Sequence, residues 1–400
     1  MDETKVVDAL VSVGGRYAGR LPKFVADRPW WAEIEAATRH LDQALGVRAV
    51  ILRLVHADEA EVGRGGRAVY HVQAAGDPRT GVLDPAPLEE WESLVAFDPL
   101  RATWAEVDGP YKLISWAAGI LGSTDWTQVK TWNLSCLIRF ATDDGGAWAK
   151  ATSRFCSVDA DVIEQVREYD ALLVPEVLGV DLENRWSLLR HVPGNDCWEP
   201  ELATVTDVVS RWVAVQAAID PSSLRTPRML PEDLAGELAG LLAGQVGERL
   251  TPDEVVAAQR LVEELPAIVA RLESAGLPNT LVHGDFHPGN WRSDGVNGRI
   301  VDWADSYIGH PATDIERLRG WLPAEKQGHA VETWTTAWKQ HLPGCDPLAA
   351  LEPIKVIARL LGAVTYQRFL DNIETSERIY HEDDPTSEVR AAIAAAGLIV

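Results

Sequence analysis

A polar loop at residues 281–292 interrupts the mainly helical second half of this sequence and strongly constrains the fold. From about residue 200 onward, the apolar residues follow a mainly helical spacing. Residues 281–292 interrupt it with LVHGDFHPGNWR, whose glycines and proline are unfavourable inside a helix. A hairpin signal, DGVNG, follows at 294–298, and we expect it to return Asp302 to the side of Asn290.

The part of the chain before residue 200 reads mainly as strands. TQVKTWNLSCLIRFAT at 127–142 predicts two strands with a break at 133–135, and DDGG predicts the next hairpin turn. GAWAKAT predicts a third strand, which carries Lys150. Residues 158–169 predict a helix with Asp159 near its N-cap, and VPEVLGVD and RWSLLRHVPG predict two further strands.

The first 122 residues predict a small α+β domain of their own. Residues 30–45 have helical periodicity, while AVILRLVH at 49–56 and RAVYHVQAA at 67–75 predict strands. A helix-compatible stretch follows at 111–122. We therefore expect domain boundaries that separate residues 1–122, 123–194 and 195–400.

The polar loop allows a metal interpretation. His283 and His287 are four residues apart, like the two ligands on a zinc-protease helix, but that motif needs a helix and a Glu directly after the first His. Here Gly284 follows the first His, and Pro288 follows the second. A metal-dependent hydrolase is therefore kept only as an alternative, and His283 is expected to stabilise the loop.

The same residues match the requirements of phosphoryl transfer from ATP. That reaction needs an acidic group that orients the attacking hydroxyl, hard oxygen ligands for Mg²⁺, and a Lys on the phosphates. Asp285, Asn290 five residues later, Asp302 after the hairpin and Lys150 on an earlier strand occur in the required order. Taken singly, each acidic or amide residue could be a turn or cap residue. Taken together, the set predicts a kinase site.

HGDFHPGN followed by IVDWADSYIGHPATD resembles the aminoglycoside phosphotransferase family, the small-molecule branch of the protein-kinase-like fold. The resemblance covers roughly residues 125–385. It implies an α+β, bilobal protein-kinase-like fold with a β-rich N-lobe and a helical C-lobe, here with an additional small α+β N-terminal domain. It implies ATP and Mg²⁺ as cofactors and a small-molecule hydroxyl as acceptor, on an aminoglycoside, another antibiotic, an amino sugar or a sugar-like compound. A non-catalytic kinase-fold protein that binds a ligand or partner remains the alternative.

The resemblance also implies roles for single residues. Asp285 is expected to be the catalytic base or hydroxyl-orienting residue, and Asn290 and Asp302 are expected to bind Mg²⁺. Lys150 is expected to hold the ATP phosphates and to pair with Asp159. The family usually has Glu at that position, so Glu164 stays open as the partner of Lys150.

The nucleotide is expected to contact two further segments. WNLS at 132–135 stands where the family has a glycine-rich phosphate loop, so the Ser135 hydroxyl and nearby amides are expected to cap the phosphates. The connector after LLRHVPG is expected to lie against adenine, with main-chain groups of Arg190 and Val192 as hydrogen-bonding partners.

Candidate residues for binding the acceptor lie near the C-terminus. Helical spacing places Gln367, Asp371 and Glu374 on one face, where they could hold an amine or sugar hydroxyls. Asp305, three residues after Asp302, is a further candidate. A solvated acidic face is the alternative for these residues. His310 and Asp314 in GHPATD are expected to stabilise the loop and cap a helix.

Composition excludes other classes of function. There are 37 Lys and Arg against 60 Asp and Glu, a net charge of -23, which argues against nucleic-acid binding. No apolar run reaches the ~18 residues of a membrane span, and MDETKVVDAL lacks the basic start of a signal peptide. Four scattered cysteines without a CxxC pair suit a reducing compartment, so we expect a cytoplasmic protein. No feature of the sequence predicts an oligomeric state.

Overall fold

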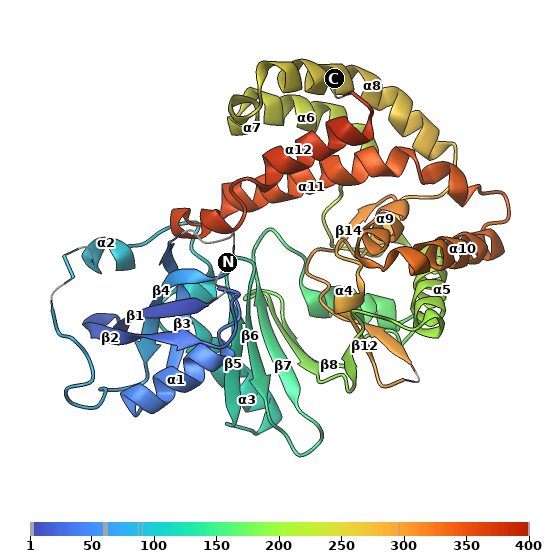
Figure 1. Cartoon of the computed structure of the whole chain (residues 1–400). Helices are drawn as coiled ribbons and strands as arrows, with labels where there is room; N and C mark the ends of the chain where they lie inside the picture. Colours follow the sequence, from blue (N-terminus) through green and yellow to red (C-terminus); the bar gives the residue numbers. More distant parts are fainter. Residues whose placement is uncertain (1–3, 59–62, 87, 90, 296, 399–400) are drawn as a thin grey trace. The chain divides into compact units, whose positions relative to one another are not determined.

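The computed structural model forms two compact units, which we call the N-unit and the C-unit. The N-unit comprises residues up to Arg154 together with Leu178–His191 and Leu370–Glu382. The C-unit comprises Phe155–Val177, Val192–Phe369 and the residues from Asp383 onward. Figure 1 labels many of the helices and strands and colours them along the chain. The structure describes residues 4–58, 63–86, 88–89, 91–295 and 297–398.

The N-unit is built on two sheets. Its first sheet has the strand order β2-β1-β4-β3, and its second has the order β5-β6-β7-β9-β8. The strands are β1 (Lys5–Val13), β2 (Arg16–Ala26), β3 (Ala49–Ala57), β4 (Gly66–Ala74), β5 (Trp126–Thr131), β6 (Ser135–Phe140), β7 (Ala147–Thr152), β8 (Val177–Asp181, whose first residue belongs to the C-unit) and β9 (Trp186–Arg190). The helices are α1 (Glu35–Leu45), α2 (Trp91–Val95) and α3 (Gly109–Leu121), with short 3₁₀ turns at η1 (Thr103–Ala105) and η6 (Thr375–Tyr380).

The structure confirms the predicted strands β3 and β4 and the helices α1 and α3, but the sequence analysis missed β1 and β2. β1 pairs antiparallel with β2 and parallel with β4, so it has a neighbour on each side. Its sequence, KVVDALVSV, is almost wholly buried because both faces of the strand are covered. A nearly continuous apolar run of this kind lacks the alternation that identifies a half-exposed strand.

One hydrophobic core joins the first sheet to the second. β3 contributes Val50 and Leu52, α3 contributes Leu113, and β6 contributes Ile138 and Phe140. The side chain of Gln128 on β5 also accepts a hydrogen bond from the amide of Ile51 and donates one to its carbonyl, each at 2.8 Å. The predicted boundary at residue 122 thus lies between two sheets of the same compact unit, and the separate N-terminal domain stays a prediction.

The second sheet confirms the strands predicted from residues 127–190. β6 pairs antiparallel with β5 and β7, and β7 pairs antiparallel with β9. Lys150 lies near the middle of β7, opposite Leu137 of β6 and Ser187 of β9. This register gives Lys150 a buried, fixed position in the sheet.

The C-unit is mainly helical. Its helices are α4 (Asp159–Arg167), α5 (Leu202–Ala218), α6 (Leu234–Ala243), α7 (Gln245–Arg249), α8 (Pro252–Glu273), α9 (Ala312–Trp321), α10 (Ala324–His341), α11 (Pro353–Asn372, whose last three residues belong to the N-unit) and α12 (Asp384–Ala395). Its short strands are β10 (Asn195–Asp196), β11 (Thr280–Val282), β12 (Trp291–Ser293), β13 (Gly298–Ile300) and β14 (Tyr307–Gly309). α6, α7 and α12 pack beside α8 or one another (Figure 1). Among the described helices, none is long and apolar enough to cross a bilayer.

The polar loop of the C-unit lies between two short sheets. β11 leads into it and pairs with β14, while β12 leaves it and forms the predicted hairpin with β13. Val296, within the predicted turn, lies outside the described residues. The amide of Val301 donates to the carbonyl of Asn290 at 2.9 Å, so the hairpin brings the chain before Asp302 back to Asn290 as expected.

Candidate active site

Asp285 is the carboxylate of the polar loop, and several side chains bind it. Its Oδ1 accepts bonds from Nε and Nη2 of Arg317 at 3.0 and 2.7 Å. Its Oδ2 lies 3.3 Å from Nε2 of His287 and accepts a bond from Nδ2 of Asn290 at 3.0 Å. The side chain is about a quarter exposed, at 26%. The carboxylate is therefore fixed in orientation while its edge reaches solvent.

The hydrogen bonds of His287 determine its tautomer. Nδ1 accepts a bond from the amide of Gly289 at 3.0 Å, so the proton of a neutral ring is on Nε2. That proton points to Oδ2 of Asp285. The imidazole is stacked on Trp198, with ring centroids 5.2 Å apart, and contacts Trp321 at 5.0 Å. His287 therefore packs between two tryptophans and faces the carboxylate of Asp285.

The charges around Asp285 keep it ionised. Burial alone would raise its pKa, but the hydrogen bond from His287 and the charge and hydrogen bonds of Arg317 hold the pKa well below its usual range. A carboxylate with so low a pKa is a weak general base. Asp285 is therefore better suited to orient a hydroxyl and stabilise developing positive charge than to carry away a proton early in the reaction.

Asp314 on α9 holds the backbone at the start of the loop. Its Oδ2 accepts bonds from the amide of His283 at 3.0 Å and from side-chain nitrogens of Trp212 and Gln216, and its Oδ1 accepts from the amide of Gly284 at 3.2 Å. Burial raises its pKa to about 6 despite these bonds. The sequence predicted a loop-stabilising or helix-capping residue here, and the structure shows the former.

His283 ties the loop to the strand before Asp302. Its Nδ1 accepts from the amide of Asp285 at 3.3 Å, and its Nε2 lies 3.1 Å from the carbonyl of Val301. Burial lowers its pKa to about 4, so the ring is neutral. Gly284 follows with φ +85° and leaves no room for a Cβ, which would lie 2.1 Å from the carbonyl oxygen of Asp305.

These contacts argue against a zinc site. Both ring nitrogens of His283 and both of His287 already contact protein groups. Within the part of the chain that the structure describes, no group of three His, Cys, Asp or Glu residues is placed to hold a metal ion. A structural zinc or a zinc hydrolase centre would need such a group.

Asn290 and Asp302 carry oxygen atoms of the kind that a magnesium ion prefers, and their role as its ligands stays a prediction. Nδ2 of Asn290 donates to the main-chain oxygen and to Oδ2 of Asp285, so its Oδ1 is the atom left for a metal. Asp302 is exposed and has φ +65°, a left-handed conformation that is rare for a residue with a side chain. Oxygen ligands from one amide and one carboxylate, completed by phosphates, are typical of Mg²⁺.

Asp159 connects α4 to the segment that carries Asp302. Its Oδ1 accepts a hydrogen bond from the amide of Trp303 at 2.9 Å, and its side chain is buried. Glu164, the other candidate partner of Lys150, is half exposed and lies 3.8 Å from Arg167 on the same helix. The C-unit therefore has Asp159, and not Glu164, in contact with the candidate metal-binding segment. The pairing of either residue with Lys150 stays a prediction.

The predicted phosphate loop is a tight, braced turn in the N-unit. The amide of Trp132 donates to the carbonyl of Ser135 at 3.1 Å, and its indole nitrogen donates to the Ser135 hydroxyl at 3.1 Å. Ser153 donates to the carbonyl of Asn133 at 2.6 Å, and the Asn133 side chain donates to the carbonyl of Glu377 at 3.3 Å. Ser135 thus occupies a fixed position, and its role toward phosphates stays a prediction.

The predicted adenine connector follows β9. Arg190 is opposite Ala147 in the sheet, and its guanidinium pairs with Asp144. Val192 is buried, and neither its amide nor its carbonyl has a hydrogen-bond partner within the described residues. Main-chain groups of this kind suit a planar heterocycle.

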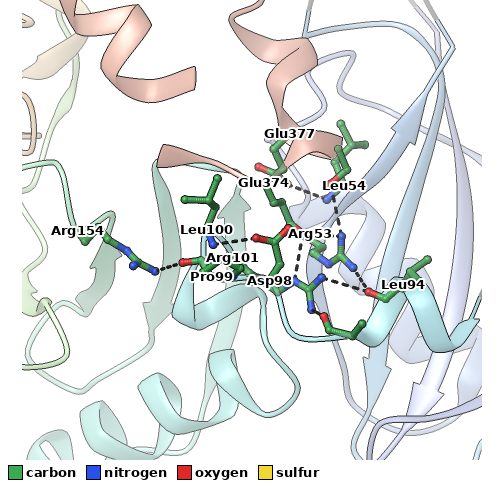
Figure 2. A network of polar contacts seen from close by, with 12 residues as sticks. Arg53, Leu54, Leu94, Asp98, Pro99, Leu100, Arg101, Arg154, Glu374 and Glu377 are labelled. Atoms are coloured by element: carbon green, nitrogen blue, oxygen red, sulfur yellow. Dashed lines mark hydrogen bonds and ion pairs between the residues drawn. The ribbon is translucent and has the colours of Figure 1, made fainter. Parts of the chain in front are cut away.

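The structure corrects the expectation for Glu374. α11 ends at Asn372, so Glu374 does not share a helical face with Gln367 and Asp371. Figure 2 shows Arg53 and Arg101 converging on its carboxylate; each has a nitrogen 3.1 Å from Oε2. Only 6% of the Glu374 side chain is exposed. We interpret it as a structural residue of the N-unit and remove it from the acceptor candidates.

Gln367, Asp371 and Asp305 remain the acceptor candidates. Gln367 and Asp371 both lie on α11, where Asp371 is exposed. Asp305 lines a small cavity of about 20 Å³ with Thr365 and Arg368. Their roles toward an acceptor stay predictions.

Sequence reasoning missed three residues around Asp285. Arg317 and Trp321 lie one turn apart on α9, and Trp198 precedes α5. None belongs to a motif, and only the folding of α9 against the polar loop brings Arg317 to Asp285. The i,i+4 spacing of Arg317 and Trp321 could have predicted their contact. The guanidinium lies 5.4 Å from the ring centroid.

A family match covers the part of the chain that carries the C-unit residues of this candidate site. Residues 151–349 match the model of the phosphotransferase enzyme family, a stretch that includes Asp159, Asp285, Asn290 and Asp302. No curated protein sequence matches the chain.

Solved structures of small-molecule kinases share the fold. Choline kinase LicA from Streptococcus pneumoniae has a TM-score of 0.53 and 12% identity, and the match covers 72% of this chain and 98% of that one. Aminoglycoside phosphotransferase APH(4)-Ia has a TM-score of 0.50 and 18% identity, with 73% and 99% covered. A thermostable mutant of the latter, in a ternary complex with AMP-PNP and hygromycin B, gives a TM-score of 0.50 at 18% identity, with 72% and 98% covered. The α+β, protein-kinase-like fold with a β-sheet N-lobe and a helical C-lobe is therefore confirmed.

Proposed function

Because the chain belongs to the phosphotransferase enzyme family through residues 151–349, we propose that it transfers the γ-phosphoryl group of Mg²⁺-ATP to a hydroxyl of a small molecule. The observation that carries the proposal is the hydrogen-bonded set of Asp285 and Asn290, which the β12–β13 hairpin joins to the segment of Asp302. ATP as donor is supported by the similar fold of APH(4)-Ia, solved with AMP-PNP.

In this reaction the acceptor oxygen forms a bond to the γ-phosphorus while the bond from that phosphorus to the bridging oxygen breaks. ADP leaves with the electron pair, and the hydroxyl proton is released through Asp285 or to solvent. Catalysis of such transfers comes mainly from positioning and charge neutralisation. A carboxylate that three hydrogen bonds and one ion-pair contact hold in place, as Asp285 is, suits positioning.

Other residues of the chain would bind the metal ion, the phosphates and the adenine. Oδ1 of Asn290 and the carboxylate of Asp302 would hold Mg²⁺, which neutralises charge on the phosphates when bound. Lys150 and Ser135 would bind phosphate oxygens, and the main-chain groups of Val192, with those of Arg190, would bind adenine. Asp159 would keep the Asp302 segment in place through the amide of Trp303.

The acceptor is best identified by testing a panel of small molecules as substrates. Aminoglycosides, other antibiotics, amino sugars, neutral sugars and amino alcohols would each be offered with Mg²⁺-ATP, and ADP formation measured. We expect ADP formation with at least one class, dependent on Mg²⁺ and lost in Asp285→Asn. An equal rate in Asp285→Asn would contradict the role of Asp285, and absence of Mg²⁺-ATP binding by the wild type would contradict the function.

A further inference from the structure

Three hydrogen bonds and one ion-pair contact already engage the carboxylate of Asp285. A carboxylate offers about four lone-pair positions. In this structure Oδ1 faces two nitrogens of Arg317, and Oδ2 faces one nitrogen each of His287 and Asn290. A substrate hydroxyl can therefore donate to Asp285 only after one of these donors has moved.

Arg317 is the donor that can move. His287 is only 10% exposed, is stacked on Trp198 and is anchored by the amide of Gly289. Asn290 is held by a second bond, to the main-chain oxygen of Asp285. The Arg317 side chain is 40% exposed, and its Nη1 makes no hydrogen bond within the described part of the chain. A long, half-exposed side chain with a spare donor can turn outward when an anionic ligand replaces Asp285 as its partner.

Exposed aromatic rings flank the same guanidinium. Trp198 and Trp321 are 49% and 45% exposed, and their ring centroids are 5.6 Å apart. His287 contacts both rings, and the Arg317 guanidinium lies over Trp321 at 5.4 Å. Apolar ring faces beside a cation with free N–H groups fit a ring compound that carries an anionic substituent.

We propose that the acceptor is a hydroxylated ring compound bearing an anionic group, and that this group draws Arg317 from Oδ1 of Asp285 and so opens Asp285 to the reacting hydroxyl. The proposal rests on the phosphotransferase function proposed above and names its acceptor class. Carboxylates and phosphates share the geometry that a guanidinium recognises. Polycationic acceptors are disfavoured, because an ammonium group would be repelled by Arg317.

Four compounds with one pyranose ring provide the probes. D-Glucuronate carries a carboxylate, glucose 6-phosphate a phosphate, glucose no charge and glucosamine an ammonium group. Phosphorylated product and ADP would be measured for each with wild type, Arg317→Gln and Arg317→Lys. We expect the wild type to prefer an anionic probe over glucose by about ten-fold in kcat/KM, the value of one charge-assisted hydrogen bond. Arg317→Gln should lose this preference and Arg317→Lys should keep part of it.

A second measurement follows the hydrolysis of ATP in place of transfer to an acceptor. With Arg317 removed, Asp285 can orient water, so Arg317→Gln should hydrolyse Mg²⁺-ATP faster than the wild type when no acceptor is present. D-Glucuronate should raise hydrolysis by the wild type but not by Arg317→Gln. Arg319→Gln is the matched control, because Arg319 lies on the same helix and pairs with Glu316 at 2.9 Å. It should behave as the wild type in both assays.

The outcomes separate the two proposals. Unchanged hydrolysis in Arg317→Gln, or preference for glucosamine over the anionic probes, would overturn the inference while leaving a phosphotransferase. A wild type that neither binds nor hydrolyses Mg²⁺-ATP would overturn the proposed function, and the inference with it. Faster hydrolysis in Arg317→Gln, together with stimulation of the wild type by glucuronate or glucose 6-phosphate, supports the inference and shows which anion the site takes.

Discussion

Oδ1 of Asp159 accepts a hydrogen bond from the backbone amide of Trp303 at a distance of 2.9 Å. The bond joins the first turn of α4 to the residue directly after Asp302, which has a left-handed backbone. A buried carboxylate that fixes the neighbour of the candidate metal ligand Asp302 gives Asp159 a role that does not depend on Lys150.

Asp159→Ala tests this role. Loss of the carboxylate leaves the buried amide of Trp303 without its acceptor, so we expect the free energy of unfolding to fall by about 1–3 kcal/mol. Affinity for Mg²⁺-AMP-PNP should fall as well, because the Asp302 segment loosens. Glu164→Gln, on the exposed side of the same helix, should change stability by less than about 0.5 kcal/mol. Chemical denaturation measures the free energy of unfolding, and nucleotide titration measures the affinity for Mg²⁺-AMP-PNP. Equal effects of Asp159→Ala and Glu164→Gln would contradict the role assigned to Asp159.

Glu374→Gln is expected to damage stability and not acceptor choice. The carboxylate neutralises Arg53 and Arg101, whose side chains are only 5% and 11% exposed. Removing one charge from such a buried group typically destabilises a protein by about 3–5 kcal/mol. Urea unfolding should show this loss, with Glu183→Gln in an exposed turn as control. A stable Glu374→Gln variant with altered acceptor preference would restore the prediction made from the sequence.

Stability should fall as the pH rises through the titration of Glu377. Burial, with Glu374 adding to it, raises the pKa of Glu377 from 4.5 to about 8. The folded state then holds a proton that the unfolded state has lost, so its stabilising effect is complete below 4.5 and disappears as the pH rises through 8. The slope contributed by one group reaches ~1.4 kcal/mol per pH unit.

Glu377→Gln should flatten this dependence. Gln remains neutral and can still accept the amide hydrogen bond of Leu54, which is 3.1 Å long. Unfolding midpoints of wild type and variant, measured across the range from 4.5 to 8, should therefore converge at low pH and separate at high pH. Parallel profiles would show that Glu377 is ionised in the folded protein.

Gly289→Ala should disturb the aromatic cluster beside Asp285. A Cβ at Gly289 would lie 2.3 Å from Trp198 and 2.8 Å from His287, so the rings must shift. Such overpacking costs about 1–3 kcal/mol, and turnover should fall together with stability. Gly236→Ala in α6 is the control, because its Cβ would meet nothing within 4 Å. It should be neutral or stabilising by up to ~1 kcal/mol. Normal turnover in Gly289→Ala would show that the cluster does not orient His287.

Local signals predicted much of the fold and selected the central candidate residues. Alternation and turn residues identified the strand of Lys150, and spacing along the chain identified Asp285, Asn290 and Asp302. The hairpin between Asn290 and Asp302 is encoded within about ten residues. Tertiary packing therefore has little effect on whether it forms.

Features that depend on distant packing could not be predicted. The contact of Arg317 with Asp285 requires α9 to fold back on the polar loop, and no spacing in the sequence reports it. The helix before Glu374 ends without a Gly or Pro, and the pairing of Glu374 with Arg53 and Arg101, more than 270 residues away in sequence, accompanies this end. β1 was missed because a strand buried on both faces has no alternation to detect.

The most direct test of phosphoryl transfer is a paired measurement of Mg²⁺-AMP-PNP affinity and phosphoryl-transfer rate in wild type, Asp285→Asn and Asp302→Ala. Asp285 is assigned to the acceptor hydroxyl and Asp302 to the metal. The two substitutions should therefore affect turnover and nucleotide affinity differently. We predict that Asp285→Asn loses most turnover with nucleotide affinity nearly unchanged, whereas Asp302→Ala loses both. Retained turnover in Asp285→Asn, or unchanged nucleotide affinity in Asp302→Ala, would contradict the assignment of these residues.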